Sequence, residues 1–209
     1  MHGVDLIRVY RIPFSTNVER VALAAGHKGV RVEWVDVDPA DRSPVRAASG
    51  QELVPVVEAD GQVLVDSPRI LAWLEERHPE PALYPADEAR RAEVQTFLDW
   101  FNLVWKRPPN LLTDELGKPE PDRARVDELG RRLTTSLDRF EALLAGREYL
   151  FGEFGVADVT AFPFLKYGRQ GMPADDDELF HRVLVDHLGM DGHPRLAAWV
   201  DRVDERPRA

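Results

Sequence analysis

Three places in the first 70 residues combine residue types that could bind a ligand or do chemistry. Ser15 precedes a helical apolar pattern that starts at Val18, so it is expected at a helix N-terminus, where unpaired N–H groups favour an anion. Val54-Pro55 opens a β-branched run, and a cis peptide there would leave the Val54 carbonyl and amide free for an extended ligand. Asp66-Ser67 precedes a helical phrase, with Ser67 expected to cap the helix and Pro68 to occupy its first position. The sequence therefore predicts a ligand site at these joints.

The elements that position these residues alternate between strand and helix over the first 78 residues. The expected strands are Leu6 to Tyr10, Val32 to Val37, Val54 to Glu58 and Gln62 to Val65. A helix whose apolar face runs from Val18 to Ala25 joins the first two strands, and Asp60-Gly61 turns the last two into a hairpin. The order β-α-β, short helix, β-β-α predicts an α/β domain with a mixed sheet.

The remainder of the chain shows only helical patterns. Three prolines between His78 and Pro85 exclude a helix there and mark a linker. One helix around Phe97 is expected to end at Pro108-Pro109, followed by a polar loop. Further helices are expected over Val126 to Leu144, from Gly155 onwards, and around Trp199. We therefore predict an α/β domain over residues 1–78, a linker over 79–86 and an all-α domain over 87–209.

Composition excludes several classes of function. The net charge of -10 opposes binding to nucleic acid or to an anionic membrane. With no cysteine there is no disulfide, thiolate metal site or cysteine nucleophile, so thiol chemistry must arrive with a substrate. The six histidines show no metal-ligand spacing, and we expect no metal. Because no apolar stretch approaches the roughly 20 residues of a membrane span and no signal peptide is apparent, a soluble cytoplasmic protein is expected.

Five motifs in sequence order carry a resemblance to a known family. They are residues 13–23 around Ser15, Gly50-Gln51 with Val54-Pro55-Val56, Asp66-Ser67, residues 149–158, and His193 to Trp199 with Arg206-Pro207. With them, nearly the whole chain resembles the cytosolic glutathione transferases. The resemblance implies a thioredoxin-like N-terminal domain with a mixed four-stranded sheet and a helical C-terminal domain. Gly155 departs from the Ser or Thr usual in the family's capping motif, which leaves only the Asp158 half of a capping box.

The resemblance also implies how the thiol is activated. Ser15 stands where other branches of the family have Cys, so a serine-type transferase is implied rather than disulfide exchange. Its hydroxyl and the helix N-terminus would hold the glutathione thiolate, with Ser15 a hydrogen-bond donor rather than a nucleophile. Tyr10 is the rival donor, although its place in an apolar strand is typical of a core residue.

The remaining site residues are likewise implied by the resemblance. Asp66 would bind the ammonium of the γ-glutamyl end, and Ser67 with its helix N-terminus the α-carboxylate. Val54, ahead of Pro55, would pair through its backbone with the cysteinyl residue. Gln51 is a candidate for the glycyl end and Trp105 for the electrophile pocket. Basic candidates for the carboxylates of the ligand are Arg11, Arg42 and Arg69.

The leading function is conjugation of glutathione to a small electrophile, in detoxification, by a homodimer. An isomerase or peroxidase on the same site is a close alternative. A scaffold or binding module without catalysis is the alternative from another class, because fold does not fix function. The chain uses Arg far more than Lys, as proteins of high-GC bacteria do. Some of these bacteria rely on other low-molecular-weight thiols, so a thiol other than glutathione stays an alternative.

Overall fold

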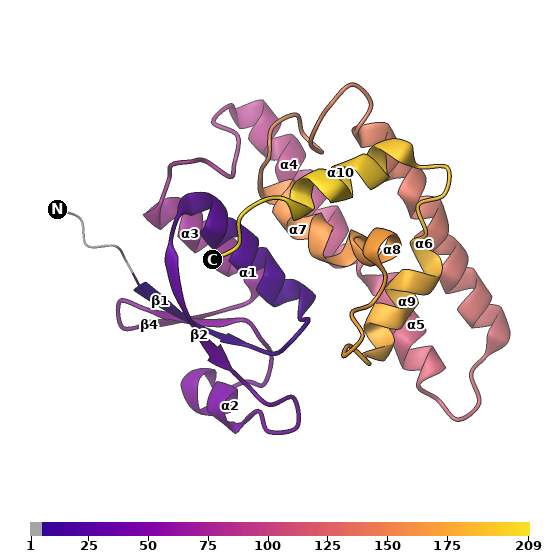
Figure 1. Cartoon of the computed structure of the whole chain (residues 1–209), viewed down its shortest axis with the longest axis horizontal. Coiled ribbons are helices and arrows are strands. Elements are labelled where there is room, and N and C mark those ends of the chain that lie inside the picture. The colour runs from indigo at the N-terminus through magenta and orange to yellow at the C-terminus, as the bar shows by residue number, and fades with distance from the viewer. Residues whose placement is uncertain (1–5) are drawn as a thin grey trace. The chain divides into compact units, whose positions relative to one another are not determined.

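A computed structural model describes residues 6–209 (Figure 1). The chain divides into two compact units. The first runs to Tyr84 and also includes Arg206–Ala209, and the second is Pro85–Glu205. The division therefore falls between Tyr84 and Pro85, in the proline-rich stretch.

The first unit contains a four-stranded sheet in the order β2-β1-β3-β4. Its elements are β1 (Leu6–Arg11), α1 (Thr16–Lys28), β2 (Arg31–Asp36), α2 (Ser43–Ser49), β3 (Val56–Ala59), β4 (Gln62–Val65) and α3 (Ser67–Arg77). β1 pairs in parallel with β2 and antiparallel with β3, which pairs antiparallel with β4. Helices α1 and α3 contact each other on one face of the sheet, and α2 lies on the other (Figure 1). The predicted mixed four-stranded sheet is confirmed.

The core of this unit lies on both faces of the sheet. Ile7 and Val9 of β1 are fully buried, as are Val21 of α1 and Leu74 of α3. On the α2 face, a buried cluster consists of Tyr10, Ile12, Val37, Val45 and Val56. Burying each such side chain contributes about 1.5–3 kcal/mol relative to exposure, so both faces of the sheet stabilise this unit.

The segment Arg206–Ala209 packs on α1, although the sequence places it at the end of the helical domain. The Ala209 amide donates to the Ala22 carbonyl at 3.1 Å, and Arg208 pairs with Glu19 at 3.2 Å. Gly26 makes this approach possible, because a Cβ there would lie 2.3 Å from the Pro207 carbonyl oxygen. Local helical and strand patterns carry no information on such a long-range contact.

The second unit is helical throughout its regular elements. They are α4 (Glu88–Trp100), η1 (Phe101–Trp105), α5 (Arg107–Leu116), α6 (Arg123–Leu143), α7 (Val156–Leu165), α8 (Tyr167–Gln170), α9 (Leu179–His187) and α10 (Pro194–Asp204). Every residue of α7 is buried, so α7 is the central helix of this unit. Asp158 in its first turn accepts hydrogen bonds from the Leu150 and Gly155 amides and from the Trp199 indole, and its bond to Gly155 is the Asp158 half of the capping box.

Pro108-Pro109 does not end the first helical run, and this expectation was wrong. The π-helical turn η1 follows α4 directly, and α5 continues to Leu116 with the prolines in its first turn. First-turn N–H groups have no intrahelical acceptor, so proline costs little there. The polar loop consequently begins at Gly117 rather than at Asn110.

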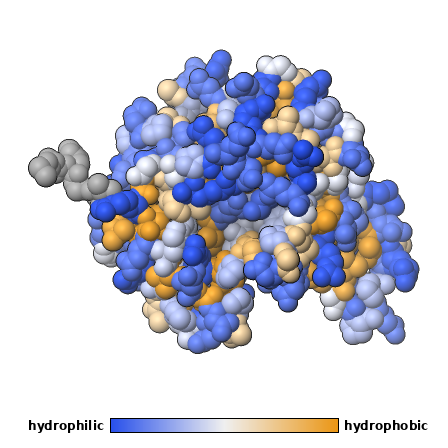
Figure 2. Space-filling model, in the orientation of Figure 1, coloured by the Kyte–Doolittle hydropathy of each residue, from blue (hydrophilic) through white to orange (hydrophobic). Residues whose placement is uncertain are grey.

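Among the described residues, no helix is long and apolar enough to cross a membrane. Figure 2 shows one face of the protein, where hydrophilic side chains predominate and hydrophobic patches lie between them. This surface agrees with a chain in which 31% of the residues are charged.

Candidate functional site

The strand register gathers the candidate residues at one end of the sheet. Val56 of β3 pairs with Tyr10 of β1 on one side and with Val65 of β4 on the other. The chain leaving β1, the chain entering β3 and the chain leaving β4 therefore meet at the same end, because β3 is antiparallel to both neighbours. These three segments carry Ser15, Val54-Pro55 and Asp66-Ser67 respectively.

Ser15 is the N-cap of α1, as expected. Its Oγ accepts a hydrogen bond from the Val18 amide at 3.4 Å, and the side chain is partly exposed. Because a hydroxyl has one donor and two acceptor positions, this bond leaves the O–H of Ser15 able to donate. Phe14 before it has a φ of 61°, which turns the chain sharply into the helix.

The cap of α3 differs from the expectation. Asp66, not Ser67, is the N-cap, and Ser67 is the first residue of the helix. Asp66 has a φ of 72° and makes no side-chain cap hydrogen bond, and its carboxylate is exposed. Strained backbone of this kind clusters at ligand sites. The N-terminus of α3 therefore has no side-chain cap from Asp66.

The Ser67 hydroxyl turns instead into the protein. It is 3% exposed, accepts from Arg20 Nη1 at 3.2 Å and donates to Asn17 Oδ1 at 3.4 Å. Burial lowers the pKa of Arg20 to about 9, against the raising effect of Asp66. Sequence reasoning missed Arg20 and Asn17. Arg20 could have been noticed because it lies four residues before Ala24, which places it on the buried face of α1.

The Val54-Pro55 peptide is cis, as the ligand hypothesis requires. Pro55 is buried and Val54 is partly exposed. β3 begins at Val56, two residues later than an expected strand starting at Val54. The backbone of Val54 consequently lies outside the paired register of the sheet, because Pro55 lacks an N–H to continue the ladder.

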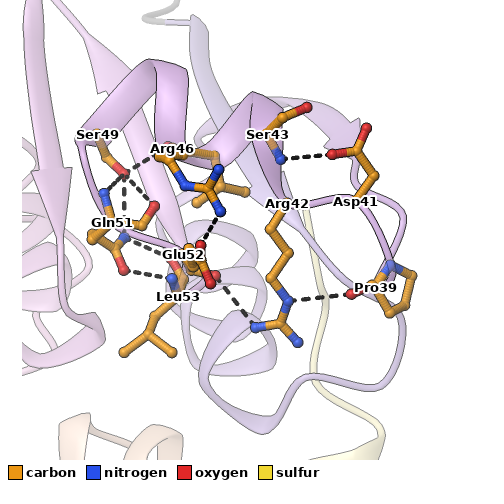
Figure 3. Close-up of polar contacts among 10 residues, drawn as sticks. Pro39, Asp41, Arg42, Ser43, Arg46, Ser49, Gln51, Glu52 and Leu53 are labelled. Carbon is orange, nitrogen blue, oxygen red and sulfur yellow. Dashed lines mark hydrogen bonds and ion pairs between the residues drawn. The ribbon is translucent and has the colours of Figure 1, made fainter.

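Gln51 is engaged in the loop that follows α2. Its amide nitrogen donates to the Leu53 carbonyl at 2.7 Å and to Ser49 Oγ at 3.3 Å, and its side-chain oxygen accepts from the Leu53 amide (Figure 3). Nearby, Arg42 donates to the Glu52 carbonyl and Arg46 pairs with Glu52 (Figure 3). These contacts hold the loop that precedes Val54-Pro55. They give Gln51 local partners and do not test its predicted contact with a ligand.

The other N-terminal candidates have local partners or lie on the surface. The Tyr10 hydroxyl donates to Glu58 at 3.2 Å, and burial raises the pKa of Tyr10 above its usual value. Tyr10 is a core residue under α2, as its strand position indicated. Arg11 pairs with Asp36 at 2.6 Å, and Arg69 is exposed on α3.

Trp105 belongs to the core of the second unit. It is 3% exposed, stacks on Phe101 with ring centroids 4.5 Å apart, and donates its indole N–H to Ser136 at 2.9 Å. It also borders a cavity of about 730 Å³ between η1, α5 and α6.

A second cavity, of about 380 Å³, adjoins Ser15 within the first unit. Its lining includes Ser15 and Val18, Trp34 and Asp36 of β2, and Arg208 with Ala209. The cavity places open volume next to the hydroxyl that caps α1. Within residues 6–209, no group of three or more His, Cys, Asp or Glu side chains is arranged to hold a metal ion.

Sequence and structure comparisons agree with this geometry. The family models "Glutathione S-transferase, N-terminal domain" and "Glutathione S-transferase, C-terminal domain" match residues 9–82 and 123–202. A maleylpyruvate isomerase from a Ralstonia species is 32% identical over 180 residues, which are 78% of this chain and 83% of that protein. Glutathione transferase omega-1 of Caenorhabditis elegans is 26% identical over 94% of this chain and 76% of its own. The crystal structure of the β-etherase LigF from Sphingobium sp. strain SYK-6 superposes with a TM-score of 0.79 at 22% identity, over 96% of both chains.

The fold and the gathered site therefore define a thioredoxin-like unit joined to a helical unit. The chain belongs to the glutathione S-transferase family. It is a glutathione-dependent enzyme of the transferase type, which confirms the family resemblance found in the sequence.

Proposed function

We propose that this enzyme bonds the glutathione sulfur to a small electrophile, with Ser15 stabilising the thiolate. The observation that carries the proposal is the meeting of Ser15, cis Val54-Pro55 and Asp66-Ser67 at one end of the sheet. A tripeptide with charged ends and a central thiol matches a site that offers an open strand edge, a helix N-terminus and a hydroxyl.

Each part of glutathione has a proposed partner. The cysteinyl residue pairs with the backbone of Val54, in the manner of strand addition. The γ-glutamyl ammonium binds the exposed carboxylate of Asp66, and the α-carboxylate binds at Ser67 and the start of α3. Gln51 remains a proposed contact of the glycyl end. To make this contact, its side chain would give up some of its hydrogen bonds to Ser49 and Leu53.

The Ser15 hydroxyl acts on the charge of the sulfur. A free thiol has a pKa of about 8.5 and is only a few per cent ionised at neutral pH. One hydroxyl donor and the positive end of α1 stabilise the thiolate, so a decrease of about 2 pKa units makes the thiolate the main form. The thiolate forms the S–C bond, and the electron pair of the broken bond leaves with the leaving group or takes up a proton.

The electrophile needs a place beside the sulfur. The cavity of about 380 Å³ next to Ser15 supports such a place in the first unit. Trp105 remains our candidate from the second unit. Detoxification of reactive small molecules in the cytoplasm is the proposed role.

Isomerisation is the second candidate function, favoured by the 32% identity to a maleylpyruvate isomerase. In that reaction glutathione adds and leaves again, so it is a cofactor rather than a consumed substrate. The same thiolate serves both reactions. Peroxide reduction on this site and a non-catalytic scaffold are the remaining alternatives.

We also propose a homodimer. Leu103 and Val104 of η1 are 74% and 56% exposed although both are apolar, which supports a partner surface on this part of the second unit.

The test combines binding and turnover. Calorimetry with glutathione should give saturable binding, whereas no binding at millimolar ligand contradicts the proposal and favours another thiol or a scaffold. With a panel of electrophiles, conjugation consumes glutathione and isomerisation leaves the total unchanged. At pH 7, Ser15→Ala should reduce turnover by up to about 20-fold, the ratio of thiolate fractions for pKa values about 2 units apart, since the end of α1 still supplies part of that shift. Turnover like that of the wild type in Ser15→Ala removes Ser15 from the mechanism.

A further inference from the structure

Arg20 is a buried cation close to the proposed glutathione site. It lies in α1, just over one helical turn beyond Ser15, and is 1% exposed. Charged side chains are rarely buried to this degree, because removing the charge from water is costly. Although burial lowers the pKa of Arg20 to about 9, the guanidinium still carries its proton at neutral pH. A full positive charge is therefore held beneath the start of α3.

The contact between Arg20 and Ser67 dictates the direction of the Ser67 hydroxyl. Arg20 Nη1 lies 3.2 Å from Ser67 Oγ, and a guanidinium can only donate. Ser67 Oγ must therefore accept from Arg20, and its own proton points elsewhere, here to Asn17 Oδ1 at 3.4 Å. That bond is long for an O–H donor, so the proton can be redirected to a better acceptor at low cost.

We propose that Arg20 is a positioning residue that orients and polarises the Ser67 hydroxyl as the donor to the α-carboxylate of glutathione. This inference rests on the proposed function. Because Ser67 does not cap α3, its hydroxyl is not consumed by the helix. A donor that itself accepts from a cation is strengthened by polarisation. With an O–H···O bond of about 2.7 Å, the guanidinium nitrogen lies within about 6 Å of the carboxylate, near enough to attract it directly in a buried setting.

The experiment compares two ligands that differ only in the carboxylate. They are glutathione and 4-aminobutyryl-cysteinylglycine, which lacks the α-carboxylate of the γ-glutamyl residue. Binding of both is measured by calorimetry for the wild type and for Arg20→Met, which removes the charge and the donor at similar length. Arg77→Met is the matched control, since Arg77 lies at the opposite end of α3 and pairs with Asp60.

We expect Arg20→Met to raise the Kd for glutathione by about 10- to 100-fold, the usual effect of losing a hydrogen bond to a charged group. The Kd for the analogue should change little, and Arg77→Met should leave both constants close to wild type. In steady-state kinetics, the KM for glutathione rises in Arg20→Met while kcat at saturation is retained. Arg20→Lys, which keeps a charge and a donor, recovers part of the affinity.

A second comparison keeps the proposal testable if Arg20→Met fails to fold. Arg20→Lys and Ser67→Ala are made singly and together, with urea unfolding as the measure of folding. Since Arg20 acts through Ser67, Arg20→Lys should weaken glutathione binding several-fold alone and add little in the Ser67→Ala background.

Two outcomes overturn the proposal. If the Arg20 variants weaken both ligands equally, Arg20 is merely structural. If they bind glutathione as the wild type does, Arg20 has no part in the site. If the wild type itself does not bind glutathione, the proposed function fails as well, and this result is distinguishable from failure at Arg20 alone.

Discussion

At the scale of single residues, the hydroxyls of Ser15 and Ser67 have different surroundings although each stands at the start of a helix. Ser15 caps α1 and is partly exposed, whereas Ser67 is buried against Arg20. The partly exposed hydroxyl is suited to contact a ligand that varies in charge, such as a thiol. The buried hydroxyl is suited to a fixed charge, such as a carboxylate.

Asp66 is predicted to recognise the ammonium of glutathione. Asp66→Asn removes the charge while keeping a residue that tolerates positive φ, so the Kd for glutathione should rise by about 5- to 20-fold. Glutaryl-cysteinylglycine, which lacks the amino group, should bind both forms with similar affinity. Calorimetry gives the Kd of each ligand for the wild type and for Asp66→Asn.

The matched control is Asp60→Asn. Asp60 also has positive φ, at 50°, but lies in the hairpin turn and pairs with Arg77. Loss of affinity in Asp60→Asn equal to that in Asp66→Asn would contradict a specific role for Asp66.

At the scale of elements, helix α7 depends on one buried carboxylate. Asp158 is 1% exposed and accepts from two amides and the Trp199 indole. Burial raises the pKa of Asp158 to about 6, because the loss of solvation outweighs the three hydrogen bonds. With a folded pKa above the unfolded value of 3.8, its contribution to stability is lost as pH rises through about 6.

Asp158→Ala should destabilise the protein by about 3 kcal/mol, because it leaves two buried donors and one partly buried donor without an acceptor. The loss should be greater at pH 5 than at pH 7.5 by about 1.4 kcal/mol, because pH 5 lies only about 1 unit below the folded pKa. Urea unfolding at the two pH values measures it. Asp122→Ala, which removes the exposed N-cap of α6, is the control and should cost about 1 kcal/mol. A larger loss of unfolding free energy at pH 7.5 than at pH 5 would contradict a raised pKa for Asp158.

Local patterns predicted most elements but not every boundary. Helical periods located α1 and α3, and β-branched or apolar runs bounded by turn residues located the four strands. Pro108-Pro109 was misread because proline stops a helix only beyond its first turn. Ser67 was misread because its burial against Arg20 arises from a contact between residues 47 apart in sequence.

At the scale of the whole molecule, the order of motifs predicted the family, and the strand register explains how the N-terminal motifs come together. Ser15, Val54 and Asp66 are far apart in sequence, but antiparallel pairing on both sides of Val56 brings their segments to one sheet end. The docking of Arg206–Ala209 on α1 could not be predicted from local patterns, since only Gly26 hints at it.

The proposed homodimer gives a prediction at this scale. Leu103→Glu should shift the protein from dimer to monomer in sedimentation experiments, because a charge replaces apolar surface at the proposed contact. Leu6→Glu, at another exposed leucine, is the control and should leave the dimer intact. A wild type that is monomeric at micromolar concentration, or a Leu103→Glu variant that stays dimeric, would contradict this assignment.

The most direct test of the central claim is the pKa of the glutathione thiol bound to the enzyme. The ultraviolet absorbance of the thiolate is followed against pH for the wild type and Ser15→Ala, each saturated with glutathione. We predict a thiol pKa about 2 units below the free value of about 8.5 in the wild type. In Ser15→Ala, which keeps the positive end of α1 but lacks the hydroxyl, we predict a smaller shift with binding retained. An unshifted thiol in the wild type, or an equal shift in both proteins, would contradict the role assigned to Ser15.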